Sequence, residues 1–231
     1  MAVQYHSRCV SYWLKIVKLP PSRLPKACYI MLRDLDIAGR QTWATSVQKL
    51  LCRYGFNHVW AQQGVGNEEL FLNIFKLRVS ENCRSEWVNN IKNSSKLATY
   101  SLFKYDLLCE GYLNVLSVRK YLAALSRFRC SCHSLAVETG RHSKVLMADR
   151  ICILCQDEHI VLEDEYHFLF GCNTYCELRE KYLARHISTP YSYQQFIDLM
   201  SSGEKKVIED LACYIYHAFK LRSDMLKTGS A

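Results

Sequence analysis

The sequence lacks any long uncharged apolar run. No window offers about 18 apolar residues in succession without a charge, so no transmembrane helix and no membrane partner are expected. The beginning of the chain, MAVQYHSRCVSYWLKIVKLPP, also lacks the cleavable apolar stretch of a secretory signal. Because disulfide scaffolds are usually short and secreted, the 12 cysteines are expected to be reduced thiols, some of them metal ligands. These absences predict an intracellular protein, nuclear or cytoplasmic.

Other signatures are missing as well. We find no internal repeat and no low-complexity run, and GVGN (64–67) lacks the further glycines and the preceding strand of a dinucleotide-binding loop. What is present is a globular composition, in which hydrophobic residues make up 49% and aromatic residues 12% of the 231 residues. A chain of this length can build one large domain or two small ones.

Apolar residues recur at helical spacing through most of the chain. Helices are expected after the hydroxyl cap Thr42 and after Asn67, where acidic residues fill the first turn. Ser192 and Gln195 have the spacing of a capping box ahead of a helical C-terminal segment. The expected fold class is mainly α, with roughly five to seven helices and one strand candidate around DRICILC (149–155).

The net charge of +8 is unevenly distributed. Residues 117–150 carry seven Arg or Lys side chains against two acidic ones, and a dense acidic run, expected to be a solvated turn, lies between Asp157 and Glu165. Such a basic segment is typical of a protein that binds RNA or DNA, although a solvated helix face is an equally good interpretation of the pattern alone. The candidate phosphate-contacting residues are Arg119, Lys120, Arg127, Arg129, Arg141, Lys144 and Arg150.

The residues most informative about function follow the spacing Cys152-x2-Cys155-x11-His167-x4-Cys172. A two-residue gap between cysteines lets a tight turn direct both thiolates at one ion, and a histidine and a cysteine five apart can complete a tetrahedron. On an ideal α-helix the histidine and the last cysteine would lie about 140° apart, and Gly171 can relieve that mismatch by ending the helix. Three sulfur ligands with one imidazole favour Zn²⁺ over Mg²⁺ or Ca²⁺.

Other interpretations of this cluster stay open. A redox CxxC pair would be expected in a thioredoxin-like βαβ context, whereas the flanks here are a charged loop and helices. A metal-free set of buried thiols is the stronger alternative, because cysteine is among the most buried residue types. His159 and Cys176 are substitute ligands, and Cys130 and Cys132 lack partners at a spacing that would complete a second site.

Three stretches resemble a known family. LSRFRCSCHSLAVETGRHSK, DRICILC and EDEYHFLFGCNTYCELR are similar to the segment beyond the reverse transcriptase in LINE-type (non-LTR) retrotransposon polyproteins. The shared pattern comprises a basic helix, a His-x-Leu…Glu-x-Gly-Arg stretch, an Arg-x-Cys-x2-Cys turn, an acidic loop and a His-Phe-x3-Cys end. The resemblance implies a tail that holds zinc, contacts RNA or DNA, and works with a separate reverse transcriptase chain.

The chain also departs from that family. A polymerase would need paired aspartates to hold two metal ions, and no two aspartates are adjacent here. VLMADR (145–150) replaces the proline-containing approach to the zinc turn, and Cys132 stands where a small residue would be expected.

The sequence patterns divide the chain into three parts. These are a helical linker-like region (1–111), a basic helix with a CCHC zinc module (112–187) and a C-terminal helical segment (188–231).

Two functions from different classes follow from these patterns. The first is a zinc-binding, non-catalytic module that contacts RNA or DNA phosphates through its basic helix. The second is a retrotransposon-derived structural or protein-interaction domain in which zinc only holds the fold. No enzyme is expected, because zinc would occupy the one candidate nucleophile pair, Cys155 and His167. We expect His133, Glu138 and Arg141 to form a buried hydrogen-bonded knot.

Overall fold

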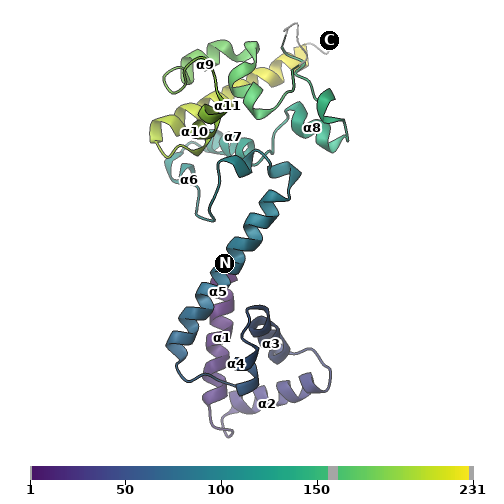
Figure 1. Ribbon diagram of the computed structural model, residues 1–231, viewed down its shortest axis with the longest axis vertical. Helices are drawn as coiled ribbons and strands as arrows, with labels where there is room; N and C mark the ends of the chain where they lie inside the picture. The colour runs from purple at the N-terminus through teal and green to yellow at the C-terminus, as the bar shows by residue number, and fades with distance from the viewer. Residues whose placement is uncertain (1, 156–160, 229–231) are drawn as a thin grey trace. The chain divides into compact units, whose positions relative to one another are not determined.

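The computed structural model describes residues 2–155 and 161–228, and the chain divides into two compact units, Met1–Trp87 and Val88–Ala231. Helices α1 to α11 dominate the described residues (Figure 1), and the one extended pairing among them is an isolated antiparallel bridge between Ile151 and Leu162. The mainly α fold class is confirmed. The predicted number of helices is too low, because short helices such as α4 (Asn57–Gln62) and α6 (Tyr112–Val115) fall between the long periodic segments.

The first unit surrounds an apolar core in which Trp13, Val47 and Phe75 are fully buried. The predicted cap is confirmed, since Thr42 and Thr45 form a capping box at the start of α3. Asn67 also accepts a hydrogen bond from the amide of Leu70, at 3.0 Å. The elements of this unit are α1 (Ala2–Lys18), α2 (Leu24–Ile37), α3 (Trp43–Arg53), α4, and the part of α5 (Glu68–Lys92) up to Trp87.

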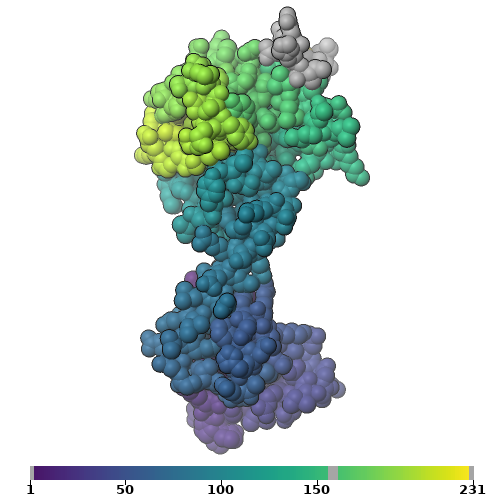
Figure 2. Space-filling view, in the orientation of Figure 1, coloured from purple at the N-terminus to yellow at the C-terminus, as the bar shows by residue number. Residues whose placement is uncertain are grey.

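The second unit is organised around α11 (Lys205–Thr228), which packs against α7 (Arg119–Arg129) and α9 (Cys176–Tyr182). Its remaining α-helices are α6, α8 (Ala136–His142) and α10 (Tyr193–Ser201). The capping box predicted at Ser192 and Gln195 is present at the start of α10. In the space-filling view the segments carrying α9, α10 and α11 form one continuous surface (Figure 2).

A single apolar core runs through the second unit. It contains buried residues from both predicted segments, 112–187 and 188–231, among them Phe168, Leu211 and Ile215. The three-part division made from the sequence stays a prediction, while the contacts divide the chain within α5. Among the described helices, none has both the length and the apolar character needed to cross a bilayer.

Candidate metal centre

Four donor atoms converge in the second unit. The sulfur atoms of Cys152, Cys155 and Cys172 and an imidazole nitrogen of His167 all lie within 4.8 Å of one another. Cys155 Sγ is 3.3 Å from His167 Nε2 and 3.6 Å from Cys172 Sγ, and Cys152 Sγ is 4.0 Å from Cys172 Sγ. A tetrahedral Zn²⁺ with Zn–S near 2.3 Å and Zn–N near 2.0 Å separates its donors by about 3.5–3.8 Å. The four predicted ligands are therefore together, at spacings that suit zinc.

The first two cysteines are positioned by a narrow pairing of backbone segments. The amide of Cys152 donates to the carbonyl of Val161 at 2.9 Å, and the amide of Glu163 donates to the carbonyl of Arg150 at 2.9 Å. The hydroxyl of Thr174 then donates to the carbonyl of Leu154 at 3.0 Å. These bonds tie the turn between the two cysteines to the chain just beyond the last ligand.

The other two ligands are positioned by a π-helical turn, His167–Gly171. The amide of Cys172 donates to the carbonyl of His167 at 2.8 Å, a bond that spans five residues. Because a π turn holds one residue more than an α turn, it returns residues five apart to the same face. The angular offset expected between His167 and Cys172 on an α-helix is thus removed by the π turn itself, and not only by Gly171 ending an α-helix.

Side chains around this turn satisfy its polar backbone groups. Asp164 accepts a hydrogen bond from the amide of His167 at 2.7 Å, at the start of the helix. At its end, the buried guanidinium of Arg179 donates to the carbonyls of Leu169 and Cys172, both at 2.8 Å. These carbonyls have left the regular helical ladder and need such partners. The ligand-bearing turn is therefore held by bonds that do not use the ligand atoms.

Glu163 connects the metal centre to two helices. Its carboxylate is 2% exposed and receives two hydrogen bonds from Arg222 of α11, at 3.0 and 2.8 Å. It also accepts from the amide of Ala136 at the start of α8, at 2.7 Å, and one of its oxygens lies 4.0 Å from Cys152 Sγ. Sequence reasoning missed this role, and no signal near Arg222 pointed to it.

Glu165 forms a second buried network. It is 3% exposed and accepts hydrogen bonds from His133 Nε2 at 3.0 Å and from the hydroxyls of Ser131 and Thr99, both at 3.1 Å. Burial opposes ionisation, but the hydrogen bond and charge interaction with His133, together with the hydrogen bond from Ser131, hold the pKa of Glu165 below its ordinary value.

The predicted solvated turn is therefore wrong for Glu163 and Glu165, because each carboxylate has its own buried donors. Asp157, Glu158 and the substitute ligand His159 lie outside the described residues. Cys176, the other substitute, is exposed and is not one of the four clustered residues.

Cys152 and Cys172 titrate as a pair. The hydrogen bond from the Cys172 thiol holds the pKa of Cys152 far below its ordinary value, and the same contact, together with burial, raises the pKa of Cys172. A shared dication would favour the thiolate at both positions, since thiolate sulfur is the form that binds metal. The cluster has the donor set of a structural zinc site, with three sulfur atoms and one imidazole.

The seven predicted basic residues fall into two groups. Arg119, Lys120 and Arg127 are exposed on α7, and Lys144 is exposed just after α8. Arg141 forms an ion pair with Glu138 at 2.8 Å. The exposed group therefore consists of Arg119, Lys120, Arg127 and Lys144.

Arg129 and Arg150 use their guanidinium groups inside the fold. Arg129 is buried, pairs with Glu110 at 3.0 Å and donates to the carbonyl of Met200. Arg150 donates to the carbonyls of Val145, at 2.9 and 3.1 Å, and of Val137, at 3.0 Å. Arg129 is therefore withdrawn from the candidate interface, because its charge is already neutralised in the core.

No family model, no curated protein and no solved structure matches this chain. What the geometry supports directly is a candidate Cys3His metal site, of a kind suited to zinc, in a helical protein.

Proposed function

We propose that this protein is a zinc-binding, non-catalytic module that contacts RNA or DNA phosphates through the exposed basic face of α7. The observation that carries the proposal is the convergence of Cys152, Cys155, His167 and Cys172 at zinc-compatible distances. The same unit presents Arg119, Lys120 and Arg127 to solvent, where a group of exposed cations favours a polyanion.

The resemblance to the tail of LINE-type retrotransposon polyproteins supports the same function. It places a basic helix before a Cys-x2-Cys turn and a His-Phe-x3-Cys end, the order found here in α7 and residues 152–172. In such a setting the module would hold the template or target strand, and a separate reverse transcriptase chain would supply the polymerase. The zinc would be structural, because all four ligands come from the protein and leave no open position.

Salt-dependent binding of RNA and DNA tests the proposal. For single strands, log K is expected to fall with log salt by about 0.7 for each phosphate contact. The triple variant R119Q/K120Q/R127Q should therefore flatten the slope by roughly 2 and leave the thermal unfolding curve unchanged. The control is K205Q/K206Q, which removes two exposed lysines at the N-terminal end of α11 that pair with Glu209 and Asp210.

Two outcomes of this titration would contradict the proposal, one for the function and one for the contact surface. If zinc-loaded wild-type protein binds neither RNA nor DNA at low ionic strength, the nucleic-acid-binding function is excluded. If it binds but the triple variant matches K205Q/K206Q, the face of α7 is not the contact surface.

A protein-interaction domain is the second candidate function, and one observation favours it. Leu146, Met147 and Ile153 are 74%, 53% and 66% exposed, close in sequence on either side of the first metal ligand. Exposed apolar patches commonly mark sites where another protein binds. In that case L146S/M147S would abolish capture of a partner without changing nucleic-acid binding.

The absence of catalysis is part of the proposal. Two-metal phosphoryl transfer needs carboxylates clustered around shared ions, and Glu163 and Glu165, beside the candidate metal centre, are engaged with buried donors. Primer extension or strand cleavage that requires Mg²⁺ and persists in the purified protein would contradict it.

A further inference from the structure

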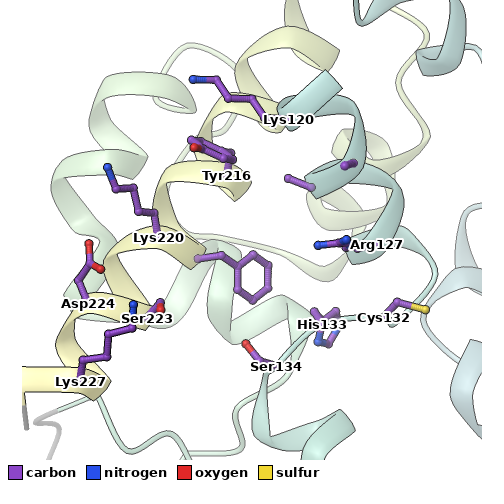
Figure 3. A pocket seen from close by; sticks show the side chains of 13 residues that line it. Lys120, Arg127, Cys132, His133, Ser134, Tyr216, Lys220, Ser223, Asp224 and Lys227 are labelled. Carbon is purple, nitrogen blue, oxygen red and sulfur yellow. The ribbon is translucent and has the colours of Figure 1, made fainter. Parts of the chain in front are cut away.

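A groove lies between α7 and the C-terminal half of α11 in the second unit (Figure 3). Its volume is about 800 Å³, and the segment Cys132–Ser134 closes one side. Small-ligand sites in proteins commonly have volumes of about 300–1,000 Å³. The groove can therefore hold a unit of one or two nucleotides, whereas a duplex is too large to enter it.

The walls of the groove are strongly cationic. Lys120 and Arg127 come from α7, Lys220 and Lys227 come from α11, and Asp224 is the one acidic residue among the described residues that line it. Arg127, Lys220 and Lys227 are exposed and form no ion pair with any described residue. Four cationic side chains and a single carboxylate around one concavity favour an anion of more than one charge.

Tyr216 and Phe219 line the groove together with these cations. Lys120 Nζ lies 4.9 Å from the ring centroids of both Tyr121 and Tyr216, a cation–π arrangement that fixes the ammonium group at one end. Tyr216 is half-buried and lies between Lys120 and Lys220 in the view of Figure 3. Cationic grooves with aromatic side chains are the combination that binds single-stranded nucleic acids, where phosphates meet the cations and bases stack on the rings.

One polar atom in the groove wall has no partner. The His133 side chain is 2% exposed, and its Nε2 bonds to Glu165. Its Nδ1 is buried without a hydrogen-bond partner among the described residues. Buried polar groups are normally satisfied, so this nitrogen is an unsatisfied polar atom in a residue that lines the groove.

We propose that this groove binds one or two nucleotides of a single-stranded RNA or DNA. Arg127, Lys220 and Lys227 contact phosphate oxygens, and Tyr216 stacks against a base. The groove site rests on the function proposed above and adds to it a location, a contribution from α11 and a preference for single strands. That preference arises because the bases of a duplex are already stacked and paired and cannot reach Tyr216.

The test compares two double variants of α11 in the full chain. K220Q/K227Q removes two cations of the groove. K205Q/K206Q removes two lysines about 21–33 Å away along the same helix, which pair with Glu209 and Asp210. Each is titrated with a labelled oligouridylate of about ten nucleotides, with an abasic phosphodiester strand of that length and with an RNA duplex. Thermal unfolding monitored by circular dichroism shows whether each variant keeps its fold.

The groove variant should lose about fivefold or more in affinity for oligouridylate, and its salt slope should flatten by about 1.4. The control should change less than about twofold, since its lysines lie outside the groove. Wild-type protein should prefer oligouridylate to the abasic strand and to the duplex, and Y216L should remove the preference over the abasic strand.

Equal effects of the two double variants would overturn the groove site, as would equal affinity of the wild type for oligouridylate and the abasic strand. Either result leaves the proposed function standing if wild-type binding still falls with salt. No binding of any probe by the wild type would refute both.

Discussion

His167 and Cys172 are joined by a 2.8 Å hydrogen bond from the amide of Cys172 to the carbonyl of His167, which closes a π-helical turn. The turn places the imidazole and the thiol on one face. Gly171 lies inside it, and a Cβ atom built there would meet His167 Nδ1 at 2.8 Å. The glycine is therefore required by the position of the ligand's ring.

The first prediction concerns this glycine. G171A should push the His167 ring out of place and lower zinc affinity by about 10–100-fold, the range seen when groups that orient metal ligands are disturbed. Competition with a chromophoric chelator measures the change. The matched control is G203A, where an added Cβ meets nothing within 4 Å. Equal zinc affinities for the two variants would show that the ring does not depend on the space at Gly171.

Metal removal is the second prediction. One zinc per chain is expected, and structural zinc sites supply about 10–16 kcal/mol of apparent free energy in small peptides near neutral pH. Chelation should therefore lower the thermal unfolding temperature, and C172S should lower it far more than C213S, whose thiol lies outside the cluster. Native mass spectrometry that finds only apoprotein, with an unchanged melting curve on chelation, would exclude the metal centre.

The four residues of the candidate metal centre could be predicted from sequence because their chemistry is visible in residue type and spacing. Helix caps such as Thr42 and Ser192 could be predicted for the same reason, since a cap is a local interaction within one turn. The π turn could not, because residue type and spacing do not distinguish a π turn from an α turn, and the longer hydrogen bond is visible only in the folded backbone.

The prediction that Arg129 contacts phosphate failed for a different reason. Arg129 lies four residues after Leu125, on the apolar stripe of α7, whereas Arg127 lies off that stripe. Helical spacing thus contained the signal, and counting charges over the segment obscured it. The burial of Glu163 had no such signal, because its partner Arg222 is 59 residues away and only the tertiary fold brings them together.

The third prediction concerns that ion pair. R222M leaves the Glu163 carboxylate buried beside Cys152 without its main partner, so the free energy of unfolding should fall by about 3–5 kcal/mol. K205M removes one partner of an exposed pair on the same helix and should cost at most about 1 kcal/mol. Urea denaturation of both variants measures the difference. Losses that agree within about 1 kcal/mol would mean that Glu163 does not depend on Arg222.

The fourth prediction concerns acid stability and Asp210, a buried residue of α11. His186 Nε2 lies 2.8 Å from its carboxylate, and Lys206 and Arg185 each approach to 3.3 Å. Burial opposes ionisation, but the hydrogen bonds from His186 and Lys206 outweigh it and hold the pKa of Asp210 below its ordinary value of 3.8. Because the folded pKa is the lower one, the ionised carboxylate stabilises the fold above pH 3.8, and this contribution is lost as the pH falls through the folded pKa.

D210N should therefore lower the free energy of unfolding near pH 7, and its deficit relative to the wild type should shrink as the pH falls below about 3.8. Acid also protonates any thiolates of the candidate metal centre, but that loss is common to both proteins, so their difference isolates Asp210. D198N, at an exposed position of α10, serves as the control for replacing a carboxylate. Urea denaturation at several pH values gives the comparison. A deficit that stays constant across this range would mean that the ion pairs of Asp210 add nothing to stability beyond the packing of its side chain.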